Sequence, residues 1–497
     1  MVLLMGIDIG TTACKVAVYD ENANVISMSR KEYKLSYPRS GWAEIDPNEM
    51  WEAVKFCIGV VVKQCKEKIT AISVSSHGEG VIPLDRMGNP VGAEIVSFDT
   101  RSMNETYELE NKFGKKYFFD KGGQILASTG TITKIIWIKK HYDLLKKTPY
   151  AYVCAGDYII MRLSGQRIID YSLAARTMML DIHKKEWNQE LMEYVGLKEE
   201  QLSIPLQSGT VVGTVRKKIA FEIGLNADAL IVTGGHDQPC GMIGAGAIQE
   251  GEAAYSLGTT ETLVCSMKNF VGKLYEYGLP CYPHVLKNQY ITIPGNFTGG
   301  NLLQWYKNLF AFEEQEIAKK ENKNVYDILM EEMTNQPSEV IVLPHFTTTG
   351  SPWNDSMSRG MIVGLQLSTT KGEYLRALQE GVTLEILLNL QLLKKAEIKV
   401  KWLIAVGGST KSKKLMQLKT DVLGVPIHIP TNVEAACKGA AFMAGYGIGI
   451  FNKSYNNWSR TGETDIWLTP CSEKHKLYLN KFKKYKRMYS IQKEILR

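Results

Sequence analysis

The sequence predicts an α/β protein built of two related lobes. Residues 5–15 and 256–262 each run from an apolar strand into Gly-Thr-Thr and then return to apolar residues. This pattern is typical of a β-hairpin whose glycine permits a tight turn and exposes main-chain N–H groups and threonine hydroxyls. The two turns lie about half of the 497-residue chain apart, so each half supplies one. Since such turns suit anions, we expect a nucleotide whose phosphates are clamped from both sides by Gly10, Thr11, Thr12, Gly258, Thr259 and Thr260.

Length and composition are those of a globular enzyme with two large domains. Lys and Arg number 59 against 52 Asp and Glu, and this modest positive balance is spread along the chain, whereas a nucleic-acid binder usually concentrates it. The main basic cluster is residues 481–487. We expect it to be the solvated face of a terminal amphipathic helix, because apolar residues recur at near-helical spacing over residues 477–489.

The nine cysteines form no Cys-x-x-Cys pair and are odd in number. They therefore indicate neither a zinc site nor a complete disulfide framework, and a reduced compartment fits best. The N-terminus has no basic segment typical of a signal peptide, and no apolar run approaches 18 residues. We expect a cytoplasmic protein with neither a nucleic-acid nor a membrane partner.

The first lobe opens with strands predicted at residues 3–9, 16–19 and 25–29. A helix then follows, in which Asp46 can cap, Pro47 suits the first helical position and Glu49 can complete a capping box. It is expected to end near Val62. Another strand at residues 69–75 leads into the polar loop 76–80, and residues 81–84 form a return strand. Strand, strand, strand, helix, strand is an α/β order with a mixed sheet.

The second lobe repeats this order. Strands at residues 252–256 and 261–265 flank the second turn, and a helix starts near Leu302. A strand at 402–406, a helix at 412–423, a strand at 426–429 and a small-residue helix at 435–446 follow. The boundary is expected between about residues 238 and 252, which gives domains of residues 1–245 and 246–497.

Asp8 ends an apolar strand immediately before the first turn. A buried carboxylate is costly without a charged partner, and Mg²⁺ bridging nucleotide phosphates is one such partner. The alternative is an Asp that caps the turn. Lys15, on the return strand, either adds a positive charge at the phosphates or lies on the surface.

Asp237 follows the apolar strand 229–233 and a Gly-Gly pair, and an apolar helix follows it. A carboxylate at a strand-to-helix junction is held rigidly at the mouth of a cleft, where it can accept a proton from an attacking hydroxyl. The alternative is an N-cap without chemistry. We interpret His236 as a loop residue rather than a base.

Ordered motifs across both halves now identify a resemblance. They are Asp8–Thr12, residues 157–165, residues 170–177, residues 234–238, Leu343-Pro344 with residues 359–365, and residues 407–409, 421–426 and 434–436. Over nearly its whole length the chain resembles the FGGY carbohydrate kinases of the actin-like ATPase superfamily. This resemblance implies two ribonuclease-H-like α/β domains with a central cleft for a nucleotide and a sugar.

The resemblance also implies residue roles. Asp237 would be the catalytic base and Asp8 would support Mg²⁺, while Thr11, Thr12 and Thr259 would contact the phosphates of ATP. Further positions match those beside the nucleotide, namely Gly300, Gln304, Gly407, Gly408 and Ser412. Glycines make sense there because a flat base or a ribose can approach only where side chains are absent. For Gln304 and Ser412 a purely structural role stays equally open.

The substrate is less clear from the sequence. Glu79 matches the Glu with which glycerol kinases bind polyol hydroxyls, and Gln238 follows the base as it does there. Gly78, however, replaces the arginine that precedes that Glu, and the Met-His pair typical of xylulokinases is absent. Residues 97–101 resemble the family's Trp-x-Asp-x-Arg loop, with Phe98 in place of tryptophan, which adds Asp99 and Arg101 as substrate-binding candidates.

The sequence thus predicts an ATP-dependent kinase of a small neutral sugar or polyol, such as a pentulose, a tetritol or glycerol. A neutral substrate is preferred over gluconate because a carboxylate at Glu79 would repel a sugar acid. A gluconate-type kinase is the alternative within the family. An actin-like or chaperone-like ATPase and a sugar-sensing regulator are the alternatives of other classes. A homodimer is left open.

Overall fold

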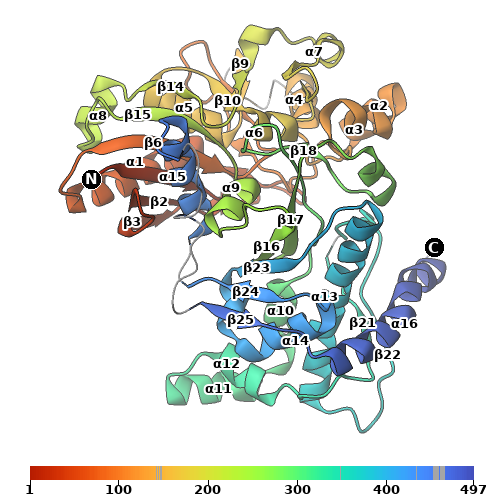
Figure 1. Cartoon of the computed structure of the whole chain (residues 1–497). Coiled ribbons are helices and arrows are strands. Elements are labelled where there is room, and N and C mark those ends of the chain that lie inside the picture. Colours follow the sequence, from red (N-terminus) through yellow and green to blue (C-terminus); the bar gives the residue numbers. More distant parts are fainter. Residues whose placement is uncertain are drawn as a thin grey trace.

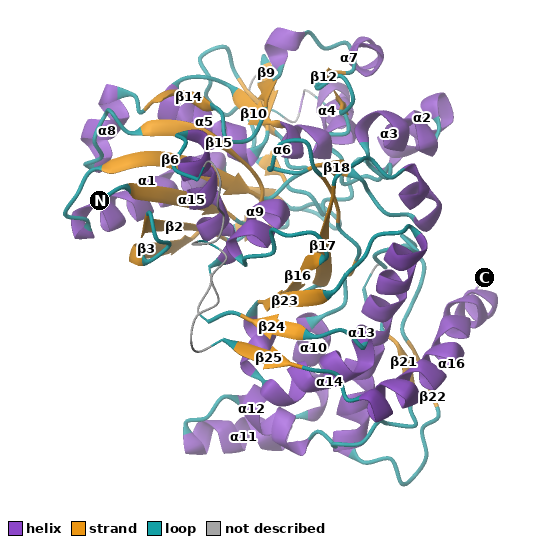
Figure 2. Cartoon of the chain, viewed as in Figure 1, coloured by secondary structure: helices purple, strands orange, loops and turns teal. Residues whose placement is uncertain are grey.

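The computed structural model describes the chain except positions 142, 144, 146, 147, 348, 432–433, 452–457, 459–464 and 497. It is an α/β structure with two central sheets (Figures 1 and 2). Among the described residues, no helix is both long enough and apolar enough to cross a membrane.

The first sheet, six-stranded within the described residues, belongs to the N-terminal half. Its strands, in spatial order, are β14 (Val211–Thr214), β15 (Leu230–His236), β6 (Ile69–Ser76), β1 (Leu3–Ile9), β2 (Ala13–Asp20) and β3 (Val25–Glu32). β1, β2 and β3 form an antiparallel meander, while β6 pairs parallel with β1 and β15 parallel with β6. The hairpin predicted around residues 10–12 is confirmed.

The second sheet, eight-stranded within the described residues, repeats this pattern. Its strands are β18 (Tyr282–Pro283), β19 (Tyr290–Thr292), β17 (Glu261–Met267), β16 (Glu252–Leu257), β23 (Trp402–Val406), β24 (Ile427–Ile429) and β25 (Ile466–Leu468), with β20 (Gly295–Asn296) beside β17. β16, β17 and β19 form a meander, and β23 and β24 add in parallel to β16. The two lobes therefore share a common five-strand arrangement, as the repeated Gly-Thr-Thr hairpins predict. The antiparallel edge strand differs, since β14 precedes β15 in the chain whereas β25 follows β24.

Helices cover both sheets (Figure 2). In the N-terminal half they are α1 (Pro47–Gln64), α2 (Met103–Phe113), α3 (Lys115–Gly122), α4 (Thr131–Lys140), α5 (Ala155–Ser164), α6 (Tyr171–Arg176), α7 (Gln189–Val195), α8 (Lys217–Ile223) and α9 (Asp237–Gly244). In the C-terminal half they are α10 (Gly300–Phe310), α11 (Phe312–Glu321), α12 (Val325–Glu332), α13 (Lys371–Lys395), α14 (Lys413–Leu423), α15 (Ala435–Gly447) and α16 (Ser472–Leu496). Short 3₁₀ turns occur at Glu199–Gln201, Gly272–Tyr277 and Gly408–Lys411.

Small sheets of two or three strands lie outside the two main sheets. They are β4 (Leu35–Ser36) with β5 (Glu44–Ile45) and β8 (Glu94–Ile95), β7 (Ile82–Leu84) with β9 (Ala151–Val153), β10 (Ile168–Asp170) with β13 (Ile204–Leu206), β11 (Leu180–Asp181) with β12 (Glu186–Trp187), and β21 (Ile341–Leu343) with β22 (Met361–Val363). The return strand predicted at residues 81–84 thus pairs with β9 and lies outside the main sheet.

α15 connects the two lobes. Although it follows β24 in sequence, it packs on β1 and α9 of the N-terminal half, where Figure 1 shows it as a blue helix among red and green elements. Glycines allow this contact: a Cβ at Gly6 would lie 1.9 Å from the Cys437 carbonyl oxygen, and one at Gly439 would lie 1.8 Å from that of Cys240. The division into residues 1–245 and 246–497 stays a prediction, because α15 belongs to the second segment by sequence and packs in the first.

Two local expectations are wrong in detail. Asp46 does cap α1, accepting from the Asn48 N–H at 2.8 Å, but Glu49 accepts from the Lys34 N–H and forms no capping box. The predicted terminal helix is confirmed as α16, and Phe482, Tyr485 and Met488 are buried on it. Lys481, however, is not part of a solvated face: its side chain is only 9% exposed.

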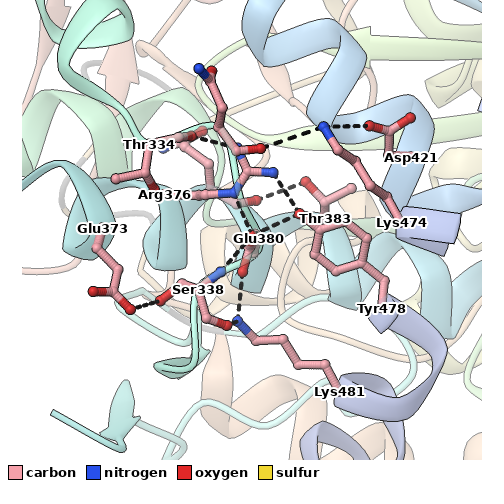
Figure 3. Close-up of polar contacts among 12 residues, drawn as sticks. Thr334, Ser338, Glu373, Arg376, Glu380, Thr383, Asp421, Lys474, Tyr478 and Lys481 are labelled. Carbon is pink, nitrogen blue, oxygen red and sulfur yellow. Dashed lines mark hydrogen bonds and ion pairs between the residues drawn. The ribbon is translucent and has the colours of Figure 1, made fainter. Parts of the chain in front are cut away.

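Lys481 belongs to a buried polar network that fastens α16 to α13 (Figure 3). The Glu380 carboxylate is fully buried and accepts from Arg376 Nε at 2.8 Å, Tyr478 OH at 2.7 Å and Lys481 Nζ at 2.5 Å. The Ser338 N–H donates to the same carboxylate at 3.3 Å. Because two cations and two further donors converge on one carboxylate, its burial is compensated.

We expect Glu380→Gln to destabilise the C-terminal lobe by about 3–5 kcal/mol, because it leaves Arg376 and Lys481 buried without a counter-charge. Glu373→Gln is the matched control, since Glu373 is half-exposed and accepts from the Ser338 hydroxyl at 3.2 Å. It should cost no more than about 1 kcal/mol. Urea unfolding followed by circular dichroism measures both, and equal losses in the two variants would contradict the role of the network.

Candidate functional site

Three parallel strands end at one edge of the first sheet. Asp8 of β1 lies opposite Ser75 of β6, and Ser76 lies opposite His236 of β15. The Ser75 hydroxyl donates to the Asp8 carboxylate at 3.3 Å. Asp237 follows His236 as the first residue of α9. Because the carboxyl ends of parallel strands meet at one edge, both predicted acidic residues lie at the same place in the fold.

The first hairpin turns at this edge. The Gly10 N–H donates to the Ala13 carbonyl at 3.0 Å, and Thr11 and Thr12 are partly or fully exposed on the turn. Lys15 does not extend freely from β2: its ammonium pairs at 2.6 Å with Glu434, the residue that precedes α15. Lys15, which the sequence predicts near the phosphates, therefore forms an ion pair with a residue of the C-terminal half.

The second hairpin is anchored by a buried ion pair. The Gly258 N–H donates to the Thr260 carbonyl at 3.1 Å, and Thr259 is exposed. Glu261, next in the chain, accepts from Lys419 Nζ at 2.7 Å and Tyr255 OH at 2.5 Å, and the Lys419 side chain is fully buried. The pair holds the base of the turn to α14.

The residues matched to the nucleotide lie around this second turn. Gly300 donates its N–H to the Gly258 carbonyl at 3.0 Å, and Gly407, at φ 118°, packs where a Cβ would lie 2.3 Å from the Leu257 carbonyl oxygen. A Cβ at Gly408 would meet open space, and Gln304 is exposed one turn into α10. Ser412 caps α14 by accepting from the Leu415 N–H at 3.3 Å, which supplies the structural role left open for it.

A cleft of about 500 Å³ opens between the two lobes. Thr11, Gly78, Glu79, Asp237 and Gln238 line it, together with Thr262, Ser351 and Asn354 from the C-terminal half. The side-chain amide oxygen of Gln238 accepts from the Thr262 hydroxyl at 3.4 Å, which joins the two halves at the cleft. The structure thus brings together the predicted base, two of the four predicted polar sugar contacts, Glu79 and Gln238, and a residue of the first hairpin.

Glu79 does not face the cleft as an isolated negative charge. It sits in the left-handed region at φ 61°, and its carboxylate forms an ion pair with Arg176 of α6. A Cβ at Gly78 would lie 3.2 Å from Cγ of Arg176 and 3.1 Å from the His236 ring. Arg176 therefore fills the space that Gly78 leaves, and α6 supplies the guanidinium that the loop lacks.

A charged histidine, His77, and a neutral one, His236, flank Asp237. His77 donates to the Glu94 carboxylate through Nε2 at 2.8 Å and to the Ile9 carbonyl through Nδ1 at 3.0 Å. Burial alone would lower the pKa of His77, but the Glu94 charge outweighs it and raises this pKa to about 9. Burial lowers the pKa of His236 well below its usual range. Its Nδ1 lies 2.9 Å from Tyr282 OH and its Nε2 lies 3.3 Å from Asp237. His236 is thus a buried neutral residue at the end of β15, and the sequence interpretation of a loop residue is wrong.

Burial raises the pKa of both candidate carboxylates. For Asp237 the charges of His77 and Arg176 act in the opposite direction, and its side chain keeps 28% exposure toward the cleft. For Asp8 burial and the neighbouring Asp237 raise the pKa to about 7. A raised pKa suits a residue that accepts a proton, and two mutually repelling carboxylates favour a cation nearby.

The described residues contain no group of three or more His, Cys, Asp or Glu side chains arranged to hold a metal ion. A divalent cation at Asp8 would therefore need ligands from elsewhere, such as the oxygens of a bound phosphate. That donor set suits Mg²⁺, which is usually held by one or two carboxylates together with phosphates and water. Asp8 is compatible with this arrangement.

Asp99 and Arg101 lie behind the cleft and do not line it. Arg101 forms a bidentate pair with Asp99, with Nη2 at 2.7 Å from Oδ2, and its guanidinium stacks 3.8 Å over the Trp42 ring. Both side chains are buried, and the Ala43 N–H also donates to Asp99 at 2.6 Å. Arg101 also pairs with Glu44 at 2.8 Å, so both predicted sugar contacts are bonded within the protein.

Lys134 of α4 is a supporting residue that the sequence reasoning missed. It is fully buried, and its ammonium donates to the carbonyls of Thr129 at 2.6 Å, Glu79 at 2.7 Å and Ser97 at 3.3 Å, all three from residues that line the cleft. Burial lowers the pKa of Lys134 to about 7. Arg176 and His77 were also missed, although Arg176 lies in the motif at residues 170–177 and His77 in the polar loop at residues 76–80.

Known proteins resemble the chain over its length. The sequence model of the FGGY family of carbohydrate kinases, N-terminal domain, matches residues 3–244, and that of its C-terminal domain matches residues 253–448. Xylulose kinase of Staphylococcus xylosus is 25% identical to the chain, and the match spans 98% of this chain and 100% of that kinase. Autoinducer-2 kinase of Escherichia coli K12 is 28% identical, and the match spans 98% of this chain and 94% of that kinase. Ligand-bound xylulose kinase from Lactobacillus acidophilus, 24% identical, superposes with a TM-score of 0.89 over 99% of this chain and 98% of its own, which confirms the fold.

We expect His77 to stay protonated through neutral pH and to titrate near pH 9, because Glu94 faces it inside the protein. Glu94→Gln should lower the pKa of His77 by about 1–3 pH units, because it removes a close opposite charge. NMR titration of ¹³C-labelled histidines, assigned with His77→Gln, measures this pKa. Glu108→Gln, at an exposed carboxylate paired with Lys140, is the control and should leave it unchanged. Titration of His77 near pH 6.5 in the unmodified protein would contradict the charged pair.

Proposed function

Because the chain belongs to the FGGY family of carbohydrate kinases, we propose that it transfers the γ-phosphoryl group of ATP to a hydroxyl of a small neutral sugar or polyol, with Asp237 as general base. The observation that carries this proposal is the cleft between the lobes. It gathers a carboxylate of raised pKa, a paired Glu79 and Arg176 and the tip of the first hairpin in one space of about 500 Å³. Such a volume suits a sugar beside the end of a nucleotide.

In the proposed reaction, the Asp237 carboxylate accepts the proton of the substrate hydroxyl. The hydroxyl oxygen bonds to the γ-phosphorus while the bond from that phosphorus to the bridging oxygen of ADP breaks. Thr11, Thr12, Thr259 and Thr260 would donate to phosphate oxygens, and Asp8 would support Mg²⁺, which would supply charge neutralisation on the phosphates. Neutral His236, if protonated on Nε2, donates toward Asp237 and orients it, while charged His77 keeps it ionised.

The substrate class rests on the charges of the cleft. The Glu79 carboxylate can still accept from sugar hydroxyls, and Gln238 and Gln124 add amide groups to the lining. The pairing of Glu79 with Arg176 weakens the repulsion expected for a sugar acid, so a gluconate-type substrate is the alternative within the family. The relatives named xylulose kinase favour a ketose such as a pentulose. Closure of the two lobes would exclude water from the transfer.

A coupled assay of ADP release tests the proposal directly. The purified protein with Mg²⁺ and ATP is screened against pentuloses, hexuloses, tetritols, glycerol and gluconate. Turnover of at least one neutral sugar or polyol supports the proposal. Turnover of gluconate alone supports the alternative, and ATP hydrolysis that no sugar stimulates would favour an ATPase of another class.

We expect Asp237→Asn to lower kcat on the best substrate by about 10²–10⁴-fold, because it removes the proton acceptor without changing the shape of the loop. ATP affinity, measured with a fluorescent nucleotide, should change little. The control is Asp228→Asn, at an exposed carboxylate shortly before β15, which should keep normal turnover. An Asp237→Asn enzyme with more than about a tenth of the normal kcat would refute the assigned role.

Glu79→Gln should lower kcat/KM for neutral sugars selectively, because the amide loses hydrogen bonds to a charged group that contribute about 1.5–3 kcal/mol. It also leaves the Arg176 guanidinium without its counter-charge at the cleft. We therefore expect the ratio of gluconate turnover to neutral-sugar turnover to rise, while the KM for ATP stays constant. Steady-state kinetics on both substrates measure the ratio, and unchanged kinetics for every accepted sugar would show that Glu79 has no part in recognition.

A further inference from the structure

A second cavity lies in the N-terminal lobe, lined by none of the residues of the catalytic cleft. It has a volume of about 500 Å³, is lined by residues of α1, α5, α8 and the turn after β7, and is open to solvent where Arg86, Arg216 and Lys218 are exposed. Its buried floor includes Trp51 of α1 and Met161 of α5.

Positive charge dominates its wall. Six cationic side chains line it, against the two carboxylates Asp85 and Glu222; the cations are Lys55, Arg86, Arg162, Arg167, Arg216 and Lys218. Lys55 is neutralised, since it pairs with Glu222 at 2.5 Å and Glu52 at 2.9 Å. Within the described part of the chain, the other five have no carboxylate at ion-pair distance. Like charges gathered in this way repel one another unless an anion joins them.

Neutral groups hold the arginines in place, and beyond ion-pair distance Glu222 compensates Arg162 and Lys218 only in part. Arg162 donates to Tyr158 OH at 2.7 Å and lies 4.8 Å over the Trp51 ring. Arg167 donates through Nη2 to the Glu200 carbonyl at 2.6 Å, and Arg86 lies 5.3 Å over the Tyr150 ring. The Nη1 atom of Arg167 is buried without a hydrogen-bond acceptor in the described structure. Orientation without neutralisation is what a preformed anion site requires.

The chemistry of the wall selects the ligand. Guanidinium groups present planar, paired donors that match the oxygens of a phosphate, and a phosphate ester carries close to two negative charges at neutral pH. A cavity of about 500 Å³ admits one molecule of sugar size. The positive charges gather around one pocket of this size, whereas a polymer such as a nucleic acid would need an extended basic surface.

We propose that this cavity is a binding site for a phosphorylated small molecule of sugar size, separate from the catalytic cleft. The proposal does not depend on the reaction assigned to the cleft. Arg216 and Arg167 form the phosphate contacts together, since Cδ of Arg216 packs beside Gly165 at the end of α5 and Arg167 follows two residues later.

Isothermal titration calorimetry of the full chain at constant ionic strength tests the site, with ribose 5-phosphate as the probe and ribose and inorganic phosphate for comparison. Arg216→Gln and Arg167→Gln should each weaken ribose 5-phosphate binding about tenfold or more, as expected when a charge-assisted hydrogen bond is lost. Lys218→Gln and Lys217→Gln are a matched pair on α8, because Lys218 lines the cavity and Lys217, also exposed, does not. Only Lys218→Gln should weaken binding.

The results separate this site from the cleft. If Glu79→Gln abolishes binding while Arg216→Gln and Arg167→Gln leave it intact, the probe binds in the catalytic cleft and the proposal fails. Equal losses in Lys217→Gln and Lys218→Gln would show a diffuse surface charge effect and would overturn it as well. Inorganic phosphate binding as tightly as ribose 5-phosphate would contradict a ligand of sugar size.

Discussion

The parallel pairing of β1 with β6 and of β6 with β15 is the constraint on which the site depends. Both faces of these strands are buried, so a shift of one residue would exchange the two sets of side chains and bring a larger one to the place where Gly6 admits α15. The same register places Asp8 beside Ser75 and brings His236 and Asp237 to the edge where the first hairpin turns. Hydrophobic burial thus fixes the position of the acidic groups.

Several buried charges around this edge come with a partner. Glu94 forms an ion pair with His77, and Arg176 forms one with Glu79. The Lys134 ammonium donates to three backbone carbonyls of residues that line the cleft. The same principle recurs in the C-terminal lobe, where Lys419 supports the second hairpin through Glu261 and α16 is fastened through Glu380. The basic cavity behind α5 departs from it, and that departure is what distinguishes it as a candidate ligand site.

Local rules predicted the elements well, because each depends on residues close in sequence. Both Gly-Thr-Thr hairpins, the Asp46 cap, the junction of β15 with α9 and the apolar face of α16 all follow from spacing and residue type. Glu49, Lys15 and Lys481 behaved differently because their partners are distant in the chain: Lys34, Glu434 and Glu380. Lys481 was expected to be solvated and Lys15 to contact phosphates, but each forms an ion pair with a residue that is distant in the sequence.

By itself the sequence determined the α/β class, the duplicated lobe, the family resemblance and the two acidic residues of the candidate site, since these depend on ordered motifs and hydrophobic patterns. Only the tertiary structure decided what surrounds them. In the structure α15 packs on the opposite lobe, and Glu79 pairs with Arg176 of α6. A charged and a neutral histidine lie near Asp237, whereas Asp99 and Arg101 pair with each other and do not line the cleft. The physical reason is that the charge, and therefore the chemistry, of a buried polar group is set by its spatial neighbours, and most of those come from segments far away along the chain.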